Sequence, residues 1–169
     1  MNIILIGMPA AGKSTVGVLL AKRLGYGFAD TDILITRKAG RPLPAIIAQA
    51  GIPRLLELEA EVGESLDCDE TVIATGGSMV FSGRAMERLK ATGVAVYLET
   101  PFEVIEQRLR RHSREARGIA APPDMSLEEV YAARAPLYEK YADLTVRCAD
   151  GLETVVEQIV QALGEEKGE

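Results

Sequence analysis

The sequence lacks the features that define several classes of proteins. Its 169 residues include only two cysteines, Cys68 and Cys148, far apart and without a CxxC spacing, so neither a disulfide framework nor a zinc site is expected. No apolar run approaches the roughly 20 residues that cross a bilayer. The net charge of −6 disfavours a nucleic-acid partner, because binding a phosphate backbone requires a basic field. We expect a cytoplasmic protein that binds neither membranes nor nucleic acid.

The chain has the length and composition of one α/β domain. Apolar residues make up 47% and charged residues 26%, which is ordinary for a soluble enzyme. A chain of this length buries roughly 70% of the surface that it exposes when unfolded. No repeat or linker divides it, so a single domain spanning residues 1–169 is predicted. The charged tail at residues 164–169 is expected to fray.

Short apolar runs alternate with helical patterns along the chain. Strands are predicted at residues 2–6, 71–74, 94–98 and 143–146, with a further strand ending near residue 30. Helices are predicted at residues 14–24, 32–38, 43–50, 54–66, 82–92, 102–111, 127–141 and 152–163. This alternation is typical of parallel β-α-β units, and it predicts a five-stranded parallel sheet with helices on both faces.

The most specific motif follows the first predicted strand. Residues 7–14 read Gly-Met-Pro-Ala-Ala-Gly-Lys-Ser, a GxxxxGK[ST] P-loop that lies between a strand and a helix, as the motif requires. Its backbone amides can converge on phosphate oxygens at the positive end of the helix. Lys13 is expected to neutralise the β- and γ-phosphates, and the Ser14 hydroxyl to bind Mg²⁺. The predicted ATP contacts in this loop are Gly7, Ala10, Ala11, Gly12, Lys13, Ser14 and Thr15.

The P-loop predicts the three-layer P-loop NTPase fold, with ATP as a substrate. Alone it does not separate a small-molecule kinase from a GTPase, a motor or a nucleotide kinase. Motors need further domains, and the sequence contains no guanine-reading NKxD. A kinase that phosphorylates a small molecule is therefore favoured.

Two carboxylates, Asp30 and Asp32, follow the first predicted helix at the end of a short strand. In such a pair one side chain can hold Mg²⁺, directly or through water, while the other orients an acceptor hydroxyl and takes its proton. The alternative is an Asx turn or a helix N-cap at either residue. The neighbouring P-loop favours the catalytic interpretation.

Further blocks make the chain resemble the shikimate kinase family over nearly its whole length. They read GKSTVG at 12–17, FADTD at 28–32, RLLE at 54–57, ATGG at 74–77 and RAPLY at 134–138, the last followed by Ala-Asp at 142–143. The resemblance implies an ATP-dependent and Mg²⁺-dependent enzyme that phosphorylates the 3-hydroxyl of shikimate, a small alcohol bearing a carboxylate. A monomer is expected.

Carried over to this chain, the resemblance assigns roles to the acceptor side of the site. Asp30 would lie in the Mg²⁺ shell, and Asp32 would bind the acceptor hydroxyls and act as the base. Arg54 and Arg134 would bind the acceptor carboxylate, for which guanidinium forks are suited. Glu57, one helical turn after Arg54, would hold that arginine in place.

The resemblance also implies a glycine turn and a lid. The backbone of Gly76 and Gly77 would contact the acceptor, which their lack of a Cβ permits. The helices at about 32–66 would form the acceptor side. A mobile lid at about 111–123 would place Arg117 over the transferring phosphate and Arg110 near the adenine. The catalytic residues implied are Asp32, Lys13 and Arg117.

Several positions depart from the family pattern, all on the acceptor side. Residues 118–120 read Gly-Ile-Ala where the lid usually continues Pro-Leu-Leu, and Ser78 stands where a third glycine is usual. Ile47 and Pro53 occupy positions that are commonly aromatic. Fewer aromatic side chains would reduce the apolar contact offered to a ring.

These departures leave two alternatives open. The first is a related enzyme that phosphorylates another small hydroxy acid, such as homoserine. The second is an ATP-binding regulatory protein without catalytic activity. The presence of Asp32, Arg117 and Arg134 disfavours the second alternative.

Overall fold

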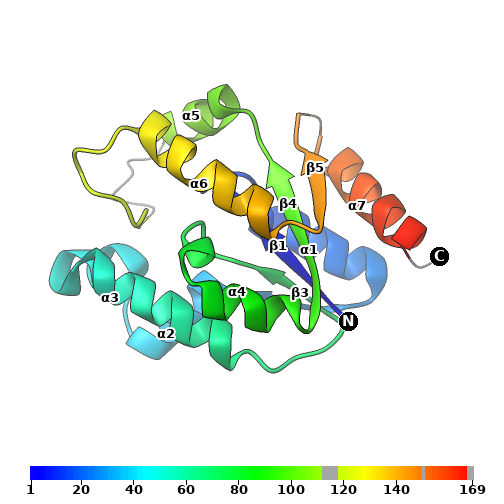
Figure 1. The fold of residues 1–169 in the computed structure, drawn as a ribbon, viewed down its shortest axis with the longest axis horizontal. Helices are drawn as coiled ribbons and strands as arrows, with labels where there is room; N and C mark the ends of the chain where they lie inside the picture. Colours follow the sequence, from blue (N-terminus) through cyan, green and yellow to red (C-terminus); the bar gives the residue numbers. More distant parts are fainter. Residues whose placement is uncertain (112–117, 150, 167–169) are drawn as a thin grey trace.

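A central parallel sheet organises the protein, studied here as a computed structural model that describes residues 1–111, 118–149 and 151–166 (Figure 1). Its five strands follow the order β2-β3-β1-β4-β5. They are β1 (Asn2–Ile6), β2 (Gly27–Asp30), β3 (Thr71–Ala74), β4 (Gly93–Glu99) and β5 (Leu144–Arg147). Every neighbouring pair is parallel. The predicted sheet and its five strands are confirmed.

The described residues also form seven α-helices and one short 3₁₀ helix, all between strands except the last, which follows β5. They are α1 (Lys13–Leu24), α2 (Thr31–Ala39), α3 (Leu43–Ser65), η1 (Met79–Phe81), α4 (Gly83–Lys90), α5 (Phe102–Arg110), α6 (Leu127–Tyr141) and α7 (Leu152–Glu166). In Figure 1, α1 and α7 lie next to each other on one side of the sheet, while α4 and α6 lie on the other side. None of these helices is both long and apolar enough to cross a membrane.

Two boundaries differ from the sequence-based expectation. The helices predicted at residues 43–50 and 54–66 form one element, α3, which is interrupted at Gly51 (φ 80°, ψ 169°). The last helix was predicted to end at residue 163, but α7 continues to Glu166, and fraying of the tail stays a prediction. Residues 167–169 lie outside the described part of the chain.

Local sequence accounts for the strand, loop and helix that carry the P-loop. Every residue of β1 is buried, as expected for the central strand of a sheet that is covered on both faces. Helix α1 ends at Leu24 and is capped by Gly25, which adopts the left-handed conformation (φ 72°) and donates its N–H to the Ala21 carbonyl.

The core has two parts. The larger cluster lies around the sheet and includes the side chains of β1, β4 and α7. A second, smaller cluster lies under α2 and α3, and it consists of Ile35, Leu43, Ile46, Leu55, Leu58, Val62 and Ala120. The acceptor helices predicted at about 32–66 therefore have an apolar cluster of their own.

Candidate active site

The P-loop folds back between β1 and α1 because three of its residues adopt positive φ angles. Gly7 has φ 147°, Ala10 has φ 66° and Gly12 has φ 94°. A Cβ at residue 7 would lie 3.0 Å from the Leu98 carbonyl oxygen, so the close approach of this loop to β4 requires a glycine. The predicted glycine turn is confirmed, and it delivers the chain to the N-terminus of α1.

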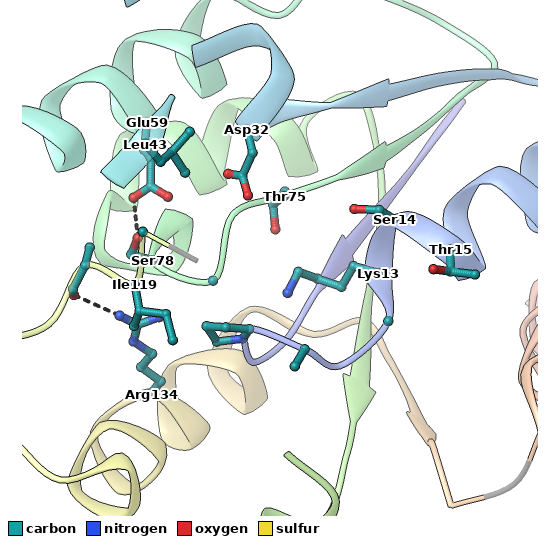
Figure 2. A pocket seen from close by; sticks show the side chains of 16 residues that line it. Lys13, Ser14, Thr15, Asp32, Leu43, Glu59, Thr75, Ser78, Ile119 and Arg134 are labelled. Atoms are coloured by element: carbon teal, nitrogen blue, oxygen red, sulfur yellow. Dashed lines mark hydrogen bonds between the residues drawn. The ribbon is translucent and has the colours of Figure 1, made fainter. Parts of the chain in front are cut away.

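Lys13 lies at the first position of α1 with its side chain turned over the loop (Figure 2). Its ammonium group donates hydrogen bonds to the carbonyls of Gly7, at 2.7 Å, and Met8, at 2.8 Å. Burial lowers the pKa of Lys13 to about 8, and the negative charge of Asp32 opposes this shift. The group is held where the tail of a nucleotide would meet the loop.

Arg108 on α5 supports the P-loop from outside, which the sequence reasoning missed. Its Nη1 donates a hydrogen bond to the Ala10 carbonyl at 2.8 Å. Arg110, the predicted adenine contact, is 73% exposed and forms an ion pair with Glu106 at 3.1 Å. The sequence did contain a signal for this difference. Arg108 and Arg110 are two residues apart on one helix, so their side chains face opposite sides of it.

Asp30 connects the P-loop helix with the start of α2. Its Oδ2 accepts a hydrogen bond from the Ser14 hydroxyl at 2.6 Å, and its Oδ1 accepts one from the Asp32 backbone N–H at 2.9 Å. The N-cap considered from the sequence is therefore present at Asp30. Ser14 and Asp30 bring two oxygen ligands of the kind that Mg²⁺ prefers to the mouth of the P-loop.

Asp32 carries the least satisfied polar atom of the site. Its Oδ1 is buried and has no hydrogen-bond partner among the described residues. Burial raises the pKa of Asp32 to about 6, the charge of Asp30 adds to this shift, and Lys13 opposes it. A buried carboxylate oxygen without a donor is costly, which points to a donor that arrives with a ligand.

Glu59, on α3, is a second buried carboxyl group in the site and was missed by the sequence reasoning. It is 2% exposed, and its Oε2 accepts a hydrogen bond from the Ser78 hydroxyl. Burial raises the pKa of Glu59 to about 7, while the Ser78 hydrogen bond opposes the shift. The available signal was an acidic residue on the apolar face of α3, between Leu55, Leu58 and Val62.

Gly76 and Gly77 form the turn after β3. At both positions neighbouring atoms occupy the space that the Cβ of another residue would need. A Cβ at residue 76 would collide with Glu59 Oε1 and lie 2.9 Å from Asp32 Oδ1. A Cβ at residue 77 would lie 3.0 Å from Arg134 Nη1. The glycine turn thus lets three functional side chains approach its backbone.

Arg134 on α6 is buried, with 2% of its surface exposed. Its Nη2 donates a hydrogen bond to the Ala120 carbonyl at 2.9 Å, and its guanidinium lies 5.4 Å from the centre of the Phe81 ring. These contacts fix the guanidinium beside the glycine turn.

These side chains surround one cleft with a volume of 230 Å³ (Figure 2). Its lining residues are Pro9, Ala10, Gly12, Lys13, Ser14, Thr15, Asp32, Leu43, Glu59, Thr75, Gly77, Ser78, Gly118, Ile119, Ala120 and Arg134. Lysine, carboxylate and arginine from four separate segments therefore meet in one space, as the sequence predicted for Lys13, Asp32 and Arg134.

Arg54 is not among the residues that line this cleft. It is 43% exposed and pairs with Glu57, at 3.0 Å, and Glu61, at 3.2 Å. The predicted contact with Glu57 is present, but Arg54 lines a different cavity together with Lys38 and other residues of α2 and α3. Arg117 lies outside the described residues.

Comparison with protein families gives one match that spans most of the chain. The family model described as shikimate kinase matches residues 9–164. A shikimate kinase of Thermosynechococcus vestitus is 40% identical over 165 residues, which cover 96% of this chain and 89% of that protein.

Solved structures give the same result. The chain superimposes on a shikimate kinase of Acinetobacter baumannii in complex with shikimate, with a TM-score of 0.84 and 32% identity, over 98% of this chain and 94% of that one. For a shikimate kinase of Aquifex aeolicus the TM-score is 0.85 and the identity 33%, with 99% and 98% covered. The sequence and structure comparisons therefore point to the same family of proteins.

Proposed function

Because the chain belongs to the shikimate kinase family, we propose that it transfers the γ-phosphate of ATP to the 3-hydroxyl of shikimate, giving shikimate 3-phosphate and ADP. The observation that carries this proposal is the cleft itself. It combines a P-loop lysine, a buried carboxylate without a donor and a buried guanidinium. Such a set can hold a nucleotide tail at one side and a hydroxy acid at the other.

On the nucleotide side, the backbone amides of Gly7 and of residues 10–15 would hold the phosphates of ATP, and Lys13 would neutralise their charge. Arg108 would keep the loop in shape through its hydrogen bond to Ala10. Arg117 remains the proposed contact with the transferring phosphate, and the lid proposed at about 111–123 would exclude water. For Arg110 we propose a contact with the adenine of ATP, as the family pattern implies.

Ser14 and Asp30 would hold Mg²⁺, and the described residues fit this role. Their oxygens lie 2.6 Å apart at the mouth of the P-loop. No group of three histidine, cysteine or acidic side chains in the described residues could form an all-protein metal site. That pattern suits Mg²⁺, which is usually held by one or two protein groups together with substrate phosphates and water. When bound, Mg²⁺ would neutralise the charge of the phosphates.

On the acceptor side, Asp32 would orient the hydroxyl and take its proton while the γ-phosphate is transferred. Arg134 would bind the carboxylate of the acceptor through charge-assisted hydrogen bonds. The backbone of Gly76 and Gly77 would contact the acceptor between these two side chains. The position of Arg54 leaves Arg134 as the only guanidinium that lines the cleft within the described residues.

We further propose a single domain over residues 1–169 that acts as a monomer in the cytoplasm. ATP and a small carboxylate-bearing alcohol would be its partners. The net charge of −6 argues against a nucleic-acid partner.

A second candidate is the phosphorylation of another hydroxy acid, such as homoserine. Ile47 and Pro53, which stand where the family commonly has aromatic residues, favour it, because they offer less apolar contact to a ring. The test is to measure kcat/KM for shikimate and homoserine with MgATP. We expect shikimate to be preferred by at least about 100-fold.

A preference for homoserine would overturn the proposal and establish the second candidate. ATP binding without phosphate transfer to either compound would instead support a regulatory protein without activity. Isothermal titration with ATP, run beside the kinetic assay, separates that outcome from a protein that fails to bind the nucleotide.

A further inference from the structure

Glu59 and Asp32 present two carboxylate oxygens to the same small space above Gly76. A Cβ placed on Gly76 would collide with Glu59 Oε1 and lie 2.9 Å from Asp32 Oδ1. The two oxygens therefore approach each other across the glycine, although they come from α3 and α2. Neither oxygen accepts a hydrogen bond from a described residue.

Ser78 fixes the orientation of Glu59. Its hydroxyl donates to Oε2, which leaves Oε1 turned toward the cleft that Glu59 and Ser78 both line. Two positive groups, Lys13 and Arg134, line the same cleft, but both donate to backbone carbonyls and neither forms an ion pair with Glu59 in the described residues. The free Oε1 of this buried carboxyl group therefore suits a donor that arrives with a ligand.

We propose that Glu59, positioned by Ser78, is a specificity-determining residue that accepts a hydrogen bond from the acceptor hydroxyl next to the one that is phosphorylated. Asp32 Oδ1 receives the reacting hydroxyl, and Glu59 Oε1 receives its neighbour. The cleft then selects carboxylic acids with two adjacent hydroxyls, and Arg134 takes the carboxylate. This inference rests on the proposed function, because the neighbour of the 3-hydroxyl of shikimate is its 4-hydroxyl.

Burial supports this role for Glu59. Moving a carboxyl group out of water is costly unless it is paired, and the one hydrogen bond from Ser78 leaves half of the group unsatisfied. Burial also raises the pKa of Glu59 to about 7. Strongly shifted groups that line a cleft are concentrated at functional sites.

The test combines changes in the enzyme with changes in the substrate. Wild type and Glu59→Ala are assayed with shikimate, 4-deoxyshikimate and 5-deoxyshikimate at saturating MgATP. In the wild type, removal of the 4-hydroxyl should lower kcat/KM by about 10- to 100-fold, the cost of one hydrogen bond to a charged group. In Glu59→Ala the same removal should cost less than about threefold, since the partner is already absent.

Three controls keep a folding effect apart from a binding effect. Glu59→Gln preserves the shape and the Ser78 contact, and it should reduce the 4-deoxy penalty, because a neutral amide forms a weaker bond than a carboxylate. Glu64→Gln, on the same helix but paired with Arg84 and outside the cleft lining, should leave all three substrates unchanged. Removal of the 5-hydroxyl should lower kcat/KM by the same factor in the wild type and in both Glu59 variants.

Ser78→Ala tests the positioning step. It should raise the KM for shikimate by a smaller factor than Glu59→Ala, with kcat within about threefold of the wild type. An equal 4-deoxy penalty in the wild type and both Glu59 variants would overturn this inference and leave the proposed function standing. A wild-type protein that does not phosphorylate shikimate would overturn both.

Discussion

Asp32 combines burial, a raised pKa and an oxygen without a donor, and each property suits a base that receives a hydroxyl proton. Oδ1 has no described partner, and the pKa of Asp32 rises to about 6 mainly through burial. A base whose pKa lies near the working pH is ionised before the reaction and still basic enough to accept a proton.

Replacing Asp32 with asparagine tests this role at the scale of one residue. Asp32→Asn keeps the shape of the side chain but removes its basicity, so kcat should fall by about 100-fold or more. The KM for ATP should change less than about threefold, because the P-loop is untouched. Steady-state kinetics with varied ATP and varied acceptor would measure both constants, and an unchanged kcat would leave the proposed base without support.

The pH dependence should report both buried carboxyl groups. Because the pKa values of Asp32 and Glu59 are raised to about 6 and about 7, each group is protonated below its value, so Asp32 can no longer take a proton and Glu59 is no longer a charged acceptor. We expect kcat/KM for shikimate to fall as the pH drops from 8 to 5, more steeply than one protonation allows. Lys13 lowers both pKa values, whereas Asp30 raises only that of Asp32 and Arg134 lowers only that of Glu59.

Glu59→Gln removes one of these two titrations. In this variant the fall of kcat/KM at low pH should therefore follow a single protonation, and the pH at the midpoint of that fall should move toward about 6. A profile measured from pH 5 to 9 at constant ionic strength would show this. Identical slopes in wild type and Glu59→Gln would contradict the expectation.

At the scale of elements, the orientation of α3 decides which charged residues enter the cleft. Arg54, Glu57 and Glu61 are spaced by three and four residues, so they share a face, and they form one exposed set of ion pairs. Glu59 is five residues after Arg54 and therefore about 140° around the helix. The same helix thus turns its glutamate into the cleft and its arginine away from it.

Matched arginine variants would test this division. Arg134→Ala should raise the KM for shikimate by about 100-fold, because it removes the guanidinium that lines the cleft. Arg54→Ala should change it by less than about threefold, since exposed ion pairs contribute little. Initial rates at fixed ATP would compare the two. A large effect of Arg54→Ala would restore the role that the family resemblance implied.

The strands and the P-loop could be predicted from the sequence because both depend on local patterns. Buried strands read as apolar runs, and the glycines and Lys13 of the P-loop have fixed spacing. The direction of Arg54 could not be predicted, because it depends on the turn of the chain at Gly51, which is part of the packing of α3. Arg108 was missed for a similar reason, since the tertiary contact with Ala10 selects it over Arg110.

The glycine turn gives a second prediction at this scale. Gly76→Ala would place a methyl group against Glu59 and Asp32, so we expect the KM for shikimate to rise at least about tenfold and the protein to lose about 1–3 kcal/mol of stability. ATP binding, measured by titration, should be retained. Gly164→Ala is the control, because nothing lies within 4 Å of its Cβ position in α7, and it should be neutral or slightly stabilising.

At the scale of the whole molecule, the cleft lies where the two apolar clusters meet. Lys13 and Arg134 belong to elements packed on the sheet, whereas Asp32 and Glu59 belong to the helices around the smaller cluster. Gly118 (φ 64°) packs against Leu43 so closely that its Cβ would lie 2.6 Å from that of leucine. Contacts between distant segments of this kind leave no local signal, so the sequence predicted the sheet but not how residues 118–120 complete the cleft.

This division predicts that the acceptor side opens more readily than the sheet. The smaller cluster contains seven buried residues, so α2 and α3 should exchange their amide hydrogens through local opening, while β1 and β4 exchange only on global unfolding. Leu58→Ala should weaken the smaller cluster by about 2–5 kcal/mol. It should therefore speed exchange in α2 and α3, and it should raise the KM for shikimate more than the KM for ATP.

Hydrogen exchange followed by mass spectrometry on wild type and Leu58→Ala would measure this, with and without shikimate. Ligand that binds the closed form alone should slow exchange in α2 and α3 in both proteins, because it stabilises the folded side of that local equilibrium. Ile159→Ala in α7 is the matched control, since it weakens the larger cluster and should affect the whole sheet. If Leu58→Ala accelerated exchange equally in β1, β4, α2 and α3, the two clusters would unfold as one unit. The acceptor helices would then have no separate stability through which shikimate could act.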